Sequence, residues 1–326
     1  MRRNELSRRT ALAGLLAATV GGGARAADWP DKTITMIVPY PAGGGSDTFG
    51  RPVASAMADR LKRSIVIDNK SGAGGTVGTA VAARAPADGY TLLLGDTGLT
   101  YAPQIYASAD FDFGRDFAPI CGLARVPYVL VVNPQKLNVA TLSAFIDAAK
   151  KRPGAIDIGS AGLGTVTHLA VGLFEERTGA KLNHVPYRGG APMLQDLLAG
   201  QVAAAFAVVG AVAAHVKSGK LRALGVAGRR REPLLADVPT MAEAGLADFR
   251  ATIWFGLFAP RRTPEAIIDR LHGVAQAALE EGKIKRLWEE QGASVELESR
   301  ADFGRFVATD TERWSRIARA ANIKLE

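Results

Sequence analysis

The sequence is poor in the residues that build disulfides, metal centres and aromatic clusters. Among 326 residues it has one cysteine and four histidines, and 7% of its residues are aromatic. Cys121 alone cannot form an intramolecular disulfide, and its apolar surroundings favour a buried thiol over a nucleophile. The histidines show neither His-x-His nor His-Glu-x-x-His spacing, so the sequence predicts no metal site and no cofactor. Core packing must therefore stabilise the chain, and its length allows this.

Beyond the N-terminal segment, no apolar run approaches the 18 uncharged residues of a membrane helix. Residues 1–26 are different. Arg8-Arg9 precede a short apolar stretch (residues 11–20), and the segment ends in Ala24-Arg25-Ala26, an A-x-A cleavage pattern. These features predict a signal peptide over residues 1–26 that is cleaved near Ala26, and the paired arginines favour the twin-arginine route. We expect a periplasmic protein.

The net charge gives little sign of a nucleic-acid partner. Of the formal +8, +4 belongs to residues 1–26, which leaves +4 for the rest of the chain. The basic residues are scattered rather than gathered in a stripe, so we expect no nucleic acid. A modest positive charge favours the approach of small anions. We expect a monomer.

The most informative stretch runs from Ile34 to Arg51, ITMIVPYPAGGGSDTFGR. An apolar, β-branched run stops at Pro39, three glycines follow, and Ser46-Asp47 opens a segment with apolar residues at helical spacing. This pattern predicts a strand, a glycine loop and a helix. Glycines let the backbone approach a ligand closely, and the first N–H groups of a helix lack intrahelical partners. The stretch therefore predicts an anion site, most simply for a carboxylate or a phosphate.

The following residues repeat this pattern. Residues 64–68 and 90–94 read as strands, each followed by a loop of small polar residues. Strands that alternate with helices predict a parallel α/β sheet, and ligands bind beyond the carboxyl ends of such strands.

Two long apolar strands divide the chain. Phe117–Val132 and Ala251–Ala259 read as crossovers between two α/β lobes. The predicted lobes are residues 27–128 plus 252–326, and residues 129–251. Two lobes joined by two strands form a clamshell with a hinge. After the second crossover, Thr263 is expected to cap a helix with Pro264 in its first turn.

Two kinds of chemistry are disfavoured by spacing. A phosphate loop ends in Gly-Lys-Ser/Thr, whereas Ser46-Asp47 follows the glycines here, and Asp47 would repel a phosphate. A hydrolase elbow needs G-x-S-x-G, but Ile158 stands two residues before Ser160. We therefore predict no catalytic residues, and expect Ser160 and Thr165 to bind a carboxylate through hydroxyl and N–H groups.

Three further features stay open on the sequence alone. Arg188 follows a predicted strand and either presents a guanidinium to an anion or lies in a surface turn. Trp254-Phe255 either line a cleft or belong to the core. Arg229-Arg230-Arg231 are expected in a solvated loop.

Six segments in one order resemble the Bug-type family, the periplasmic solute-binding proteins of tripartite tricarboxylate transporters. They are WPDKTITMIVPYPAGGGSDTFGR, DNKSGAGGTVGT with PADGYTLLLG, GSAGLGTVTHLA, HVPYRGGAPMLQDLLAG, SGKLRALGV and FGLFAPRRTPEAI. The resemblance covers essentially the whole mature chain. It implies a type II periplasmic-binding-protein fold without catalysis, and a small carboxylate held between two lobes largely by backbone groups and bridging water.

The resemblance also implies a set of ligand contacts, which come from two lobes. From the first lobe they are Tyr40, Ala42, Gly43, Gly44, Ser46, Asp47 and Thr97; from the second, Ser160, Gly164, Thr165, His168, Tyr187 and Gly189.

The chain departs from the family pattern at two places. Ala207 stands where an acidic residue is usual, and Arg261-Arg262 follow Pro260 where a small neutral residue is usual. The missing acid disfavours an amino acid ligand and favours a mono- or dicarboxylate, including an aromatic one. The expected partners are membrane transporter subunits. The alternatives are a sensor kinase, and a periplasmic α/β enzyme that acts on a carboxylate.

Overall fold

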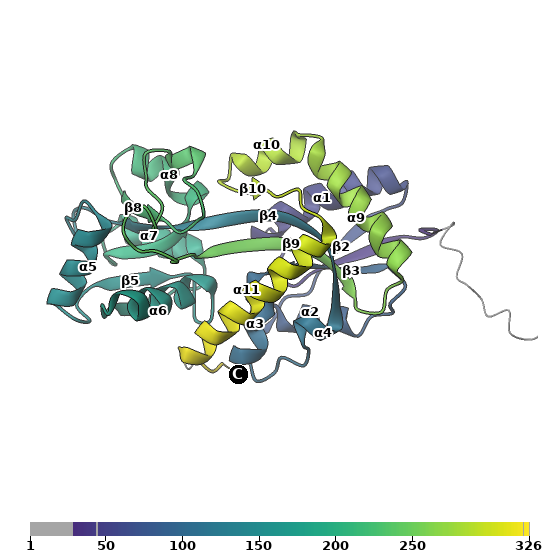
Figure 1. The fold of residues 1–326 in the computed structure, drawn as a ribbon, viewed down its shortest axis with the longest axis horizontal. Coiled ribbons are helices and arrows are strands. Elements are labelled where there is room, and N and C mark those ends of the chain that lie inside the picture. Colours follow the sequence, from purple (N-terminus) through teal and green to yellow (C-terminus); the bar gives the residue numbers. More distant parts are fainter. Residues whose placement is uncertain (1–28, 44, 322, 326) are drawn as a thin grey trace, which may run out of the picture.

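In the described part of the chain, ten strands form one connected sheet that curls through both halves of the molecule (Figure 1). The structure is a computed structural model and describes residues 29–43, 45–321 and 323–325. The predicted signal peptide lies outside these residues. The strands are β1 (Ile34–Val38), β2 (Ile65–Asn69), β3 (Thr91–Asp96), β4 (Phe117–Val132), β5 (Asp157–Ser160), β6 (Asn183–Pro186), β7 (Ala204–Val208), β8 (Arg222–Val226), β9 (Thr252–Pro260) and β10 (Ser294–Val295).

Helices cover both halves of this sheet. They are α1 (Gly45–Leu61), α2 (Thr76–Ala83), α3 (Thr97–Ile105), α4 (Phe113–Asp116), α5 (Leu142–Lys151), α6 (Val166–Thr178), α7 (Gly190–Leu198), α8 (Val209–Lys217), α9 (Glu265–Glu280), α10 (Lys283–Glu289) and α11 (Arg300–Ala320). None of the helices in the described ranges is long and apolar enough to span a bilayer.

The sheet connects two lobes through β4 and β9, which run side by side between them (Figure 1). In the first lobe β1 pairs in parallel with β2 and β3, as the sequence pattern predicts, and β9 adds antiparallel to β3. From Phe117 to Pro127 β4 pairs with β9; from Tyr128 onward it pairs with β7 and β8 of the second lobe. This two-lobed α/β architecture confirms the predicted fold class.

Each lobe has its own buried aromatic cluster. Phe145, Phe174 and Phe206 are buried in the second lobe, and in the first the ring of Trp288 is tilted against that of Phe49, 5.2 Å away. Trp254 and Phe255 are both buried, so of the two alternatives for this pair the core is the one observed. Cys121 is also buried, and burial raises its pKa to about 12, which leaves an inert thiol.

A row of glycines lets α11 lie close to the sheet. Gly256 of β9 is in register with Gly95 of β3 and Gly122 of β4. A Cβ on Gly256 would lie 2.3 Å from Cζ of Phe303, a side chain of α11 that is 1% exposed. A Cβ on Gly122 would also meet Phe303, at 3.0 Å. The absence of side chains at this level therefore makes room for the aromatic ring that fixes α11.

We expect Gly256→Ala to lower the free energy of unfolding by about 2 kcal/mol, because an added methyl group overpacks this contact. Gly273→Ala is the matched control: Gly273 is in α9, no atom lies within 4 Å of the added Cβ, and alanine favours a helix. Urea unfolding of both variants measures the difference. Equal midpoints for Gly256→Ala and the native chain would contradict the close packing of Phe303.

The predicted cap of the helix after β9 is wrong. Pro264 occupies the N-cap position of α9 with extended backbone angles, and no side chain caps the helix. Thr263 donates its backbone N–H to Pro260, and its hydroxyl is buried without a hydrogen-bond partner in the described structure. The turn that closes β9 thus places Thr263 one residue too early to cap the helix.

Candidate ligand-binding site

The glycine loop after β1 is organised by one carboxylate. Asp47 is 5% exposed, and its Oδ2 accepts hydrogen bonds from the Gly43 N–H at 2.6 Å and from the Arg51 guanidinium at 2.9 and 3.0 Å. Its Oδ1 accepts from the amide of Asn69 at 3.0 Å. Burial raises the pKa of Asp47, but the hydrogen bonds from Asn69, Gly43 and Arg51 outweigh it and hold the pKa below its usual value. Asp47 therefore fixes the loop from inside.

The rest of this loop is exposed before α1, whereas Ser46 within α1 is 8% exposed. Ala42 and Gly43 are exposed, and Gly43 has a φ of 76°, which favours glycine. Ser46 lies in the first turn of α1, where N–H groups lack intrahelical acceptors. Gly44, the remaining predicted contact of this loop, lies outside the described residues. The loop thus offers N–H groups next to a helix N-terminus.

A second carboxylate, which sequence reasoning missed, lies at the end of β3. Asp96 is 3% exposed; its Oδ1 accepts from the N–H groups of Gly98 at 2.7 Å and Leu99 at 3.3 Å, and caps α3. Tyr40 also hydrogen-bonds to this carboxyl. Burial raises the pKa of Asp96 to about 6, against the opposing effect of these hydrogen bonds. A Gly-Asp-Thr-Gly loop after an apolar strand was the only signal for it in the sequence.

The predicted contact Thr97 is fully buried. Its side chain is 0% exposed, and its Oγ1 accepts a hydrogen bond from the backbone N–H of Trp254 at 2.9 Å. The hydroxyl therefore ties α3 to the crossover strand β9, and does not face solvent in this structure.

In the second lobe, the loop after β5 is braced by hydroxyl groups. Thr165 is the N-cap of α6 and donates its hydroxyl to the Gly162 carbonyl at 2.7 Å. Ser160 is 0% exposed, and its Oγ contacts the backbone of Gly162. Thr167 accepts from the Ala161 N–H at 2.9 Å. These bonds fix the loop between β5 and α6. The Thr165 hydroxyl also accepts from the N–H of His168 at 3.4 Å, and the other N–H groups of this first turn lack intrahelical acceptors.

Two histidines stack next to this loop. The rings of His168 and His184 lie 4.0 Å apart with an interplanar angle of 8°. Nδ1 of His168 accepts the Gly164 N–H at 3.1 Å, which assigns the ring proton to Nε2. Burial, and to a smaller extent the neighbouring His184, lower the pKa of His168 to about 4; burial also lowers the pKa of His184. His168 is therefore neutral near pH 7 and keeps an N–H donor.

We expect the imidazole of His168 to titrate near pH 4 and to show no titration between pH 6 and 8. An NMR pH titration of the ring resonances measures this, with His168→Gln to assign the signal. The unfolded chain takes up this proton near pH 6.5, so this group makes the protein less stable as the pH falls from 6.5 to 4. A midpoint near 6.5 in the folded protein would contradict the buried, stacked arrangement.

Sequence reasoning also missed a close Ser–His pair. Oγ of Ser160 lies 2.7 Å from Nε2 of His184, two residues that are 24 positions apart in the chain. A nucleophile must be reachable by its substrate, and Ser160 is fully buried. In this structure the pair therefore braces the loop.

The last two predicted contacts are on the next strand and helix. Tyr187 follows β6, donates its hydroxyl to Asp196 at 2.8 Å and lies within 4 Å of the position of a Cβ on Gly159. Gly189 is the N-cap of α7 with a φ of 121°. Arg188 between them is exposed, which agrees with a surface turn.

The two halves of the predicted site meet at the junction of the lobes. The hydroxyl of Tyr101, in α3, donates to the carbonyl of Gly164 at 3.1 Å. A Cβ on Gly164 would lie 3.3 Å from Ile105 of the same helix. These contacts join α3, which Asp96 caps, to the loop before α6 that contains Gly164. Within the described residues, no three His, Cys, Asp or Glu side chains are grouped as a metal site would need.

Comparison with known proteins places this geometry in a family. The sequence model described as the tripartite tricarboxylate transporter family receptor matches residues 49–323. BugT of Bordetella pertussis is 37% identical over 325 residues, which are 98% of this chain and 99% of that protein.

Solved structures agree. The R. palustris protein Rpa4515 with adipate has a TM-score of 0.79 and 34% identity, over 91% of this chain and 100% of that one. MatC from Rhodopseudomonas palustris with bound malate has a TM-score of 0.76 and 30% identity, over 89% of this chain and 100% of that one. The periplasmic binding protein BugD has a TM-score of 0.75 and 32% identity, over 91% and 100%. The chain belongs to the tripartite tricarboxylate transporter receptor family, and it is similar to the Bug-type proteins, to BugT in sequence and to BugD in fold.

Proposed function

We propose that the protein binds a small mono- or dicarboxylate between its two lobes and delivers it to the membrane subunits of a tripartite tricarboxylate-type transporter. The observation that carries this proposal is the pair of loops at the lobe junction. One loop precedes α1 and is held by Asp47; the other precedes α6 and is held by Thr165. Each leaves helix N-terminal N–H groups for a carboxylate.

The neutral His168 adds a donor without adding charge. Its Nε2–H can donate to a carboxylate oxygen, and the backbone groups around it supply the remaining hydrogen bonds. The relatives solved with adipate and with malate support a carboxylate ligand. A site made mostly of backbone groups is compatible with aliphatic and aromatic carboxylates.

The division into lobes gives this site a means of closing. We propose that residues 27–128 plus 252–326 move against residues 129–251 through β4 and β9. Closure of this kind buries the ligand and creates the surface that a membrane partner recognises. We also propose a signal peptide over residues 1–26, twin-arginine export to the periplasm, and a monomer.

A thermal-shift panel of small carboxylates tests the ligand class on residues 27–326. A ligand that binds only the folded state adds about 2.7 kcal/mol at a hundredfold excess over its Kd, so a selective rise in Tm identifies it. The panel contains adipate, malate, benzoate and phthalate. A flat panel would contradict the proposal.

The alternatives remain as outcomes of the same experiment. Chemical conversion of a panel member would favour an enzyme and make Ser160 and His168 the first residues to test for catalysis. A sensory role would be favoured by two results together. The ligand is bound and recovered unchanged, and in the cell the protein engages a sensor kinase instead of transporter subunits.

A further inference from the structure

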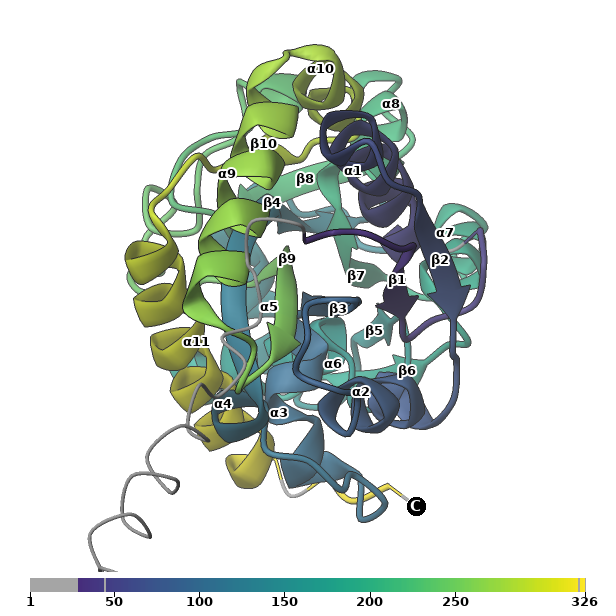
Figure 2. The ribbon, with the colours of Figure 1, turned by 90° about the vertical axis from the view of Figure 1, so that its right-hand side faces the viewer.

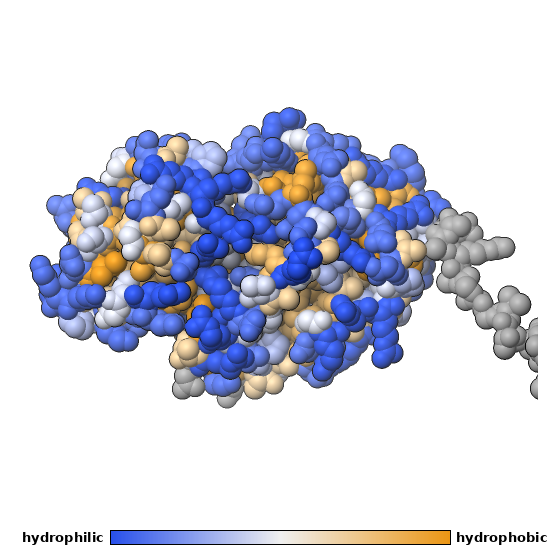
Figure 3. Space-filling view, viewed as in Figure 1, coloured by the Kyte–Doolittle hydropathy of each residue, from blue (hydrophilic) through white to orange (hydrophobic). Residues whose placement is uncertain are grey.

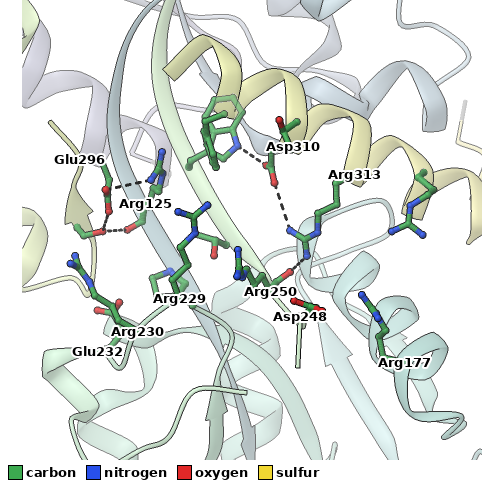
Figure 4. Close-up of a pocket in the computed structure, with 18 residues that line it drawn as sticks. Arg125, Arg177, Arg229, Arg230, Glu232, Asp248, Arg250, Glu296, Asp310 and Arg313 are labelled. Atoms are coloured by element: carbon green, nitrogen blue, oxygen red, sulfur yellow. Dashed lines mark hydrogen bonds and ion pairs between the residues drawn. The ribbon is translucent and has the colours of Figure 1, made fainter. Parts of the chain in front are cut away.

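A cavity rich in arginine lies beside the crossover strands. It has a volume of about 500 Å³, within the range of small-molecule pockets. Its lining includes seven arginines and four carboxylates, but none of the predicted ligand contacts. Figure 4 shows these side chains around β4, β9 and α11.

The arginines converge from several elements of both lobes. Arg125 comes from β4, and Arg313 and Arg316 come from α11. Arg177 is in the last turn of α6. The other three, Arg229, Arg230 and Arg250, lie in the segments after β8 and before β9. Elements far apart in the sequence thus bring seven guanidinium groups to one space.

Two of these guanidinium groups are held in place. Arg125 is 18% exposed, makes hydrogen bonds to Glu298 at 2.9 and 3.1 Å, and lies 4.0 Å above the ring of Phe306. Arg313 lies 3.6 Å from Asp310 and donates to the carbonyl of Arg250. Asp310 in turn accepts from the indole of Trp254 at 2.8 Å. The rear of the cavity is therefore preorganised.

Of the remaining five arginines, Arg316 lies 3.8 Å from Glu176, and the other four are less compensated. Within the described residues, the side chains of Arg177, Arg229, Arg230 and Arg250 form no ion pair. Burial lowers the pKa of Arg313, and the positive charges of Arg250, Arg177 and Arg316 lower it further, which shows that like charges are brought together here.

Four carboxylates line the cavity, three fewer than its arginines, and they are Glu232, Asp248, Glu296 and Asp310. Glu296 and Asp310 are engaged by Arg125 and Arg313. Glu232 is 7% exposed, and burial raises its pKa to about 7, so part of its negative charge is absent at neutral pH. The cavity therefore keeps an excess of positive charge.

The cavity is also separate from the candidate ligand site. In Figure 2, α11 lies on one side of β4 and β9, and β1, β5 and β6 lie on the other. In Figure 3, strongly hydrophilic side chains cross the middle of the face that carries α11, between the two lobes. The cavity and the candidate ligand site are therefore lined by different residues.

We propose that this arginine cavity is a second binding site, for a small anion that carries two or more phosphate or carboxylate groups. Guanidinium groups bind such oxyanions in a bidentate way, and several of them around one space favour a multiply charged ligand over a single carboxylate. Because both lobes and both crossover strands line the cavity, one bound anion would contact all of them.

Calorimetric titration of residues 27–326 with inorganic pyrophosphate at low ionic strength tests this proposal. We expect saturable binding that weakens at least tenfold in the double variant Arg229→Gln, Arg230→Gln, since each lost charged hydrogen bond weakens binding and both residues are exposed without an ion pair. Added salt should weaken binding in the native chain.

The matched control is Arg152→Gln, Arg262→Gln. These two arginines are exposed, do not line the cavity, and their replacement changes the net charge equally. We expect the control to keep the native affinity for pyrophosphate. Equal weakening in both double variants, or no saturable binding to the native chain, would overturn the proposal.

A parallel titration with citrate distinguishes the two sources of negative charge. Tighter binding of pyrophosphate assigns the cavity to phosphorylated ligands, and tighter binding of citrate assigns it to polycarboxylates. Either result supports the site if the double variant Arg229→Gln, Arg230→Gln weakens the binding of that ligand. Citrate can also enter the interlobe site. Citrate binding that is unchanged by the double variant would therefore overturn the polycarboxylate assignment.

Discussion

Asp47→Asn is expected to lower the free energy of unfolding by about 2–3 kcal/mol at pH 7.5 and to weaken carboxylate binding at least tenfold. Donors face both oxygens of this carboxylate: the Gly43 N–H and Arg51 on one, Asn69 on the other. An amide replaces one acceptor by an NH₂ group, so a donor meets a donor in a buried place. The glycine loop then loses the bond that fixes Gly43.

Urea unfolding and calorimetric titration measure the two effects. Arg51→Gln is the control, because Arg51 is 52% exposed and its loss removes one partner while Gly43 stays bound. The pKa of Asp47 is lowered in the folded state, so its contribution is complete above pH 4 and is lost as the pH falls through the folded value. An unchanged urea midpoint for Asp47→Asn would contradict the loop geometry.

The same substitution at Asp96 is expected to change the free energy of unfolding in the opposite direction. Asp96→Asn should raise the free energy of unfolding by about 3 kcal/mol at pH 7.5, because a pKa raised from 3.8 to about 6 corresponds to roughly this penalty for the charged form. Asparagine keeps the N-cap: its carbonyl accepts from Gly98 and Leu99, and its NH₂ can donate to the oxygen of Tyr40.

The pH dependence of stability distinguishes the removal of a buried charge in Asp96→Asn from a change in stability that is the same at every pH. Between pH 3.8 and 6 the folded protein holds a proton that the unfolded chain releases, so the cost of Asp96 appears as the pH rises through this window. The advantage of Asp96→Asn should therefore shrink toward zero near pH 4. A destabilised variant at pH 7.5, or a difference that does not change with pH, would show that the charged carboxylate is well solvated or paired.

Asp47 lies in a segment whose structure the sequence predicts, whereas the role of Asp96 was not predicted. The strand, glycine loop and helix around Asp47 follow from local patterns, and the structure has them as β1 and α1. The long apolar run from Phe117 to Val132 likewise predicts the crossover strand β4. Such features depend on residues close together in the chain.

Features that depend on distant pairing were not predicted. The hydroxyl of Thr97 meets the N–H of Trp254 across 157 positions, and Ser160 meets His184 across 24. The glycine row at Gly95, Gly122 and Gly256 exists only once the registers of three strands are known. Buried polar contacts of this kind have no periodic signal, so only the fold reveals them. The predicted ligand contacts remain a prediction.

The most direct measurement is a calorimetric titration of residues 27–326 with the carboxylate that the thermal-shift panel selects, followed by NMR analysis of the recovered ligand. We expect one saturable site per chain, at least tenfold weaker binding by Asp47→Asn, and ligand returned chemically unchanged. Absence of saturable binding for every carboxylate, or conversion of the ligand, would contradict a carboxylate-binding protein built on the loops before α1 and α6.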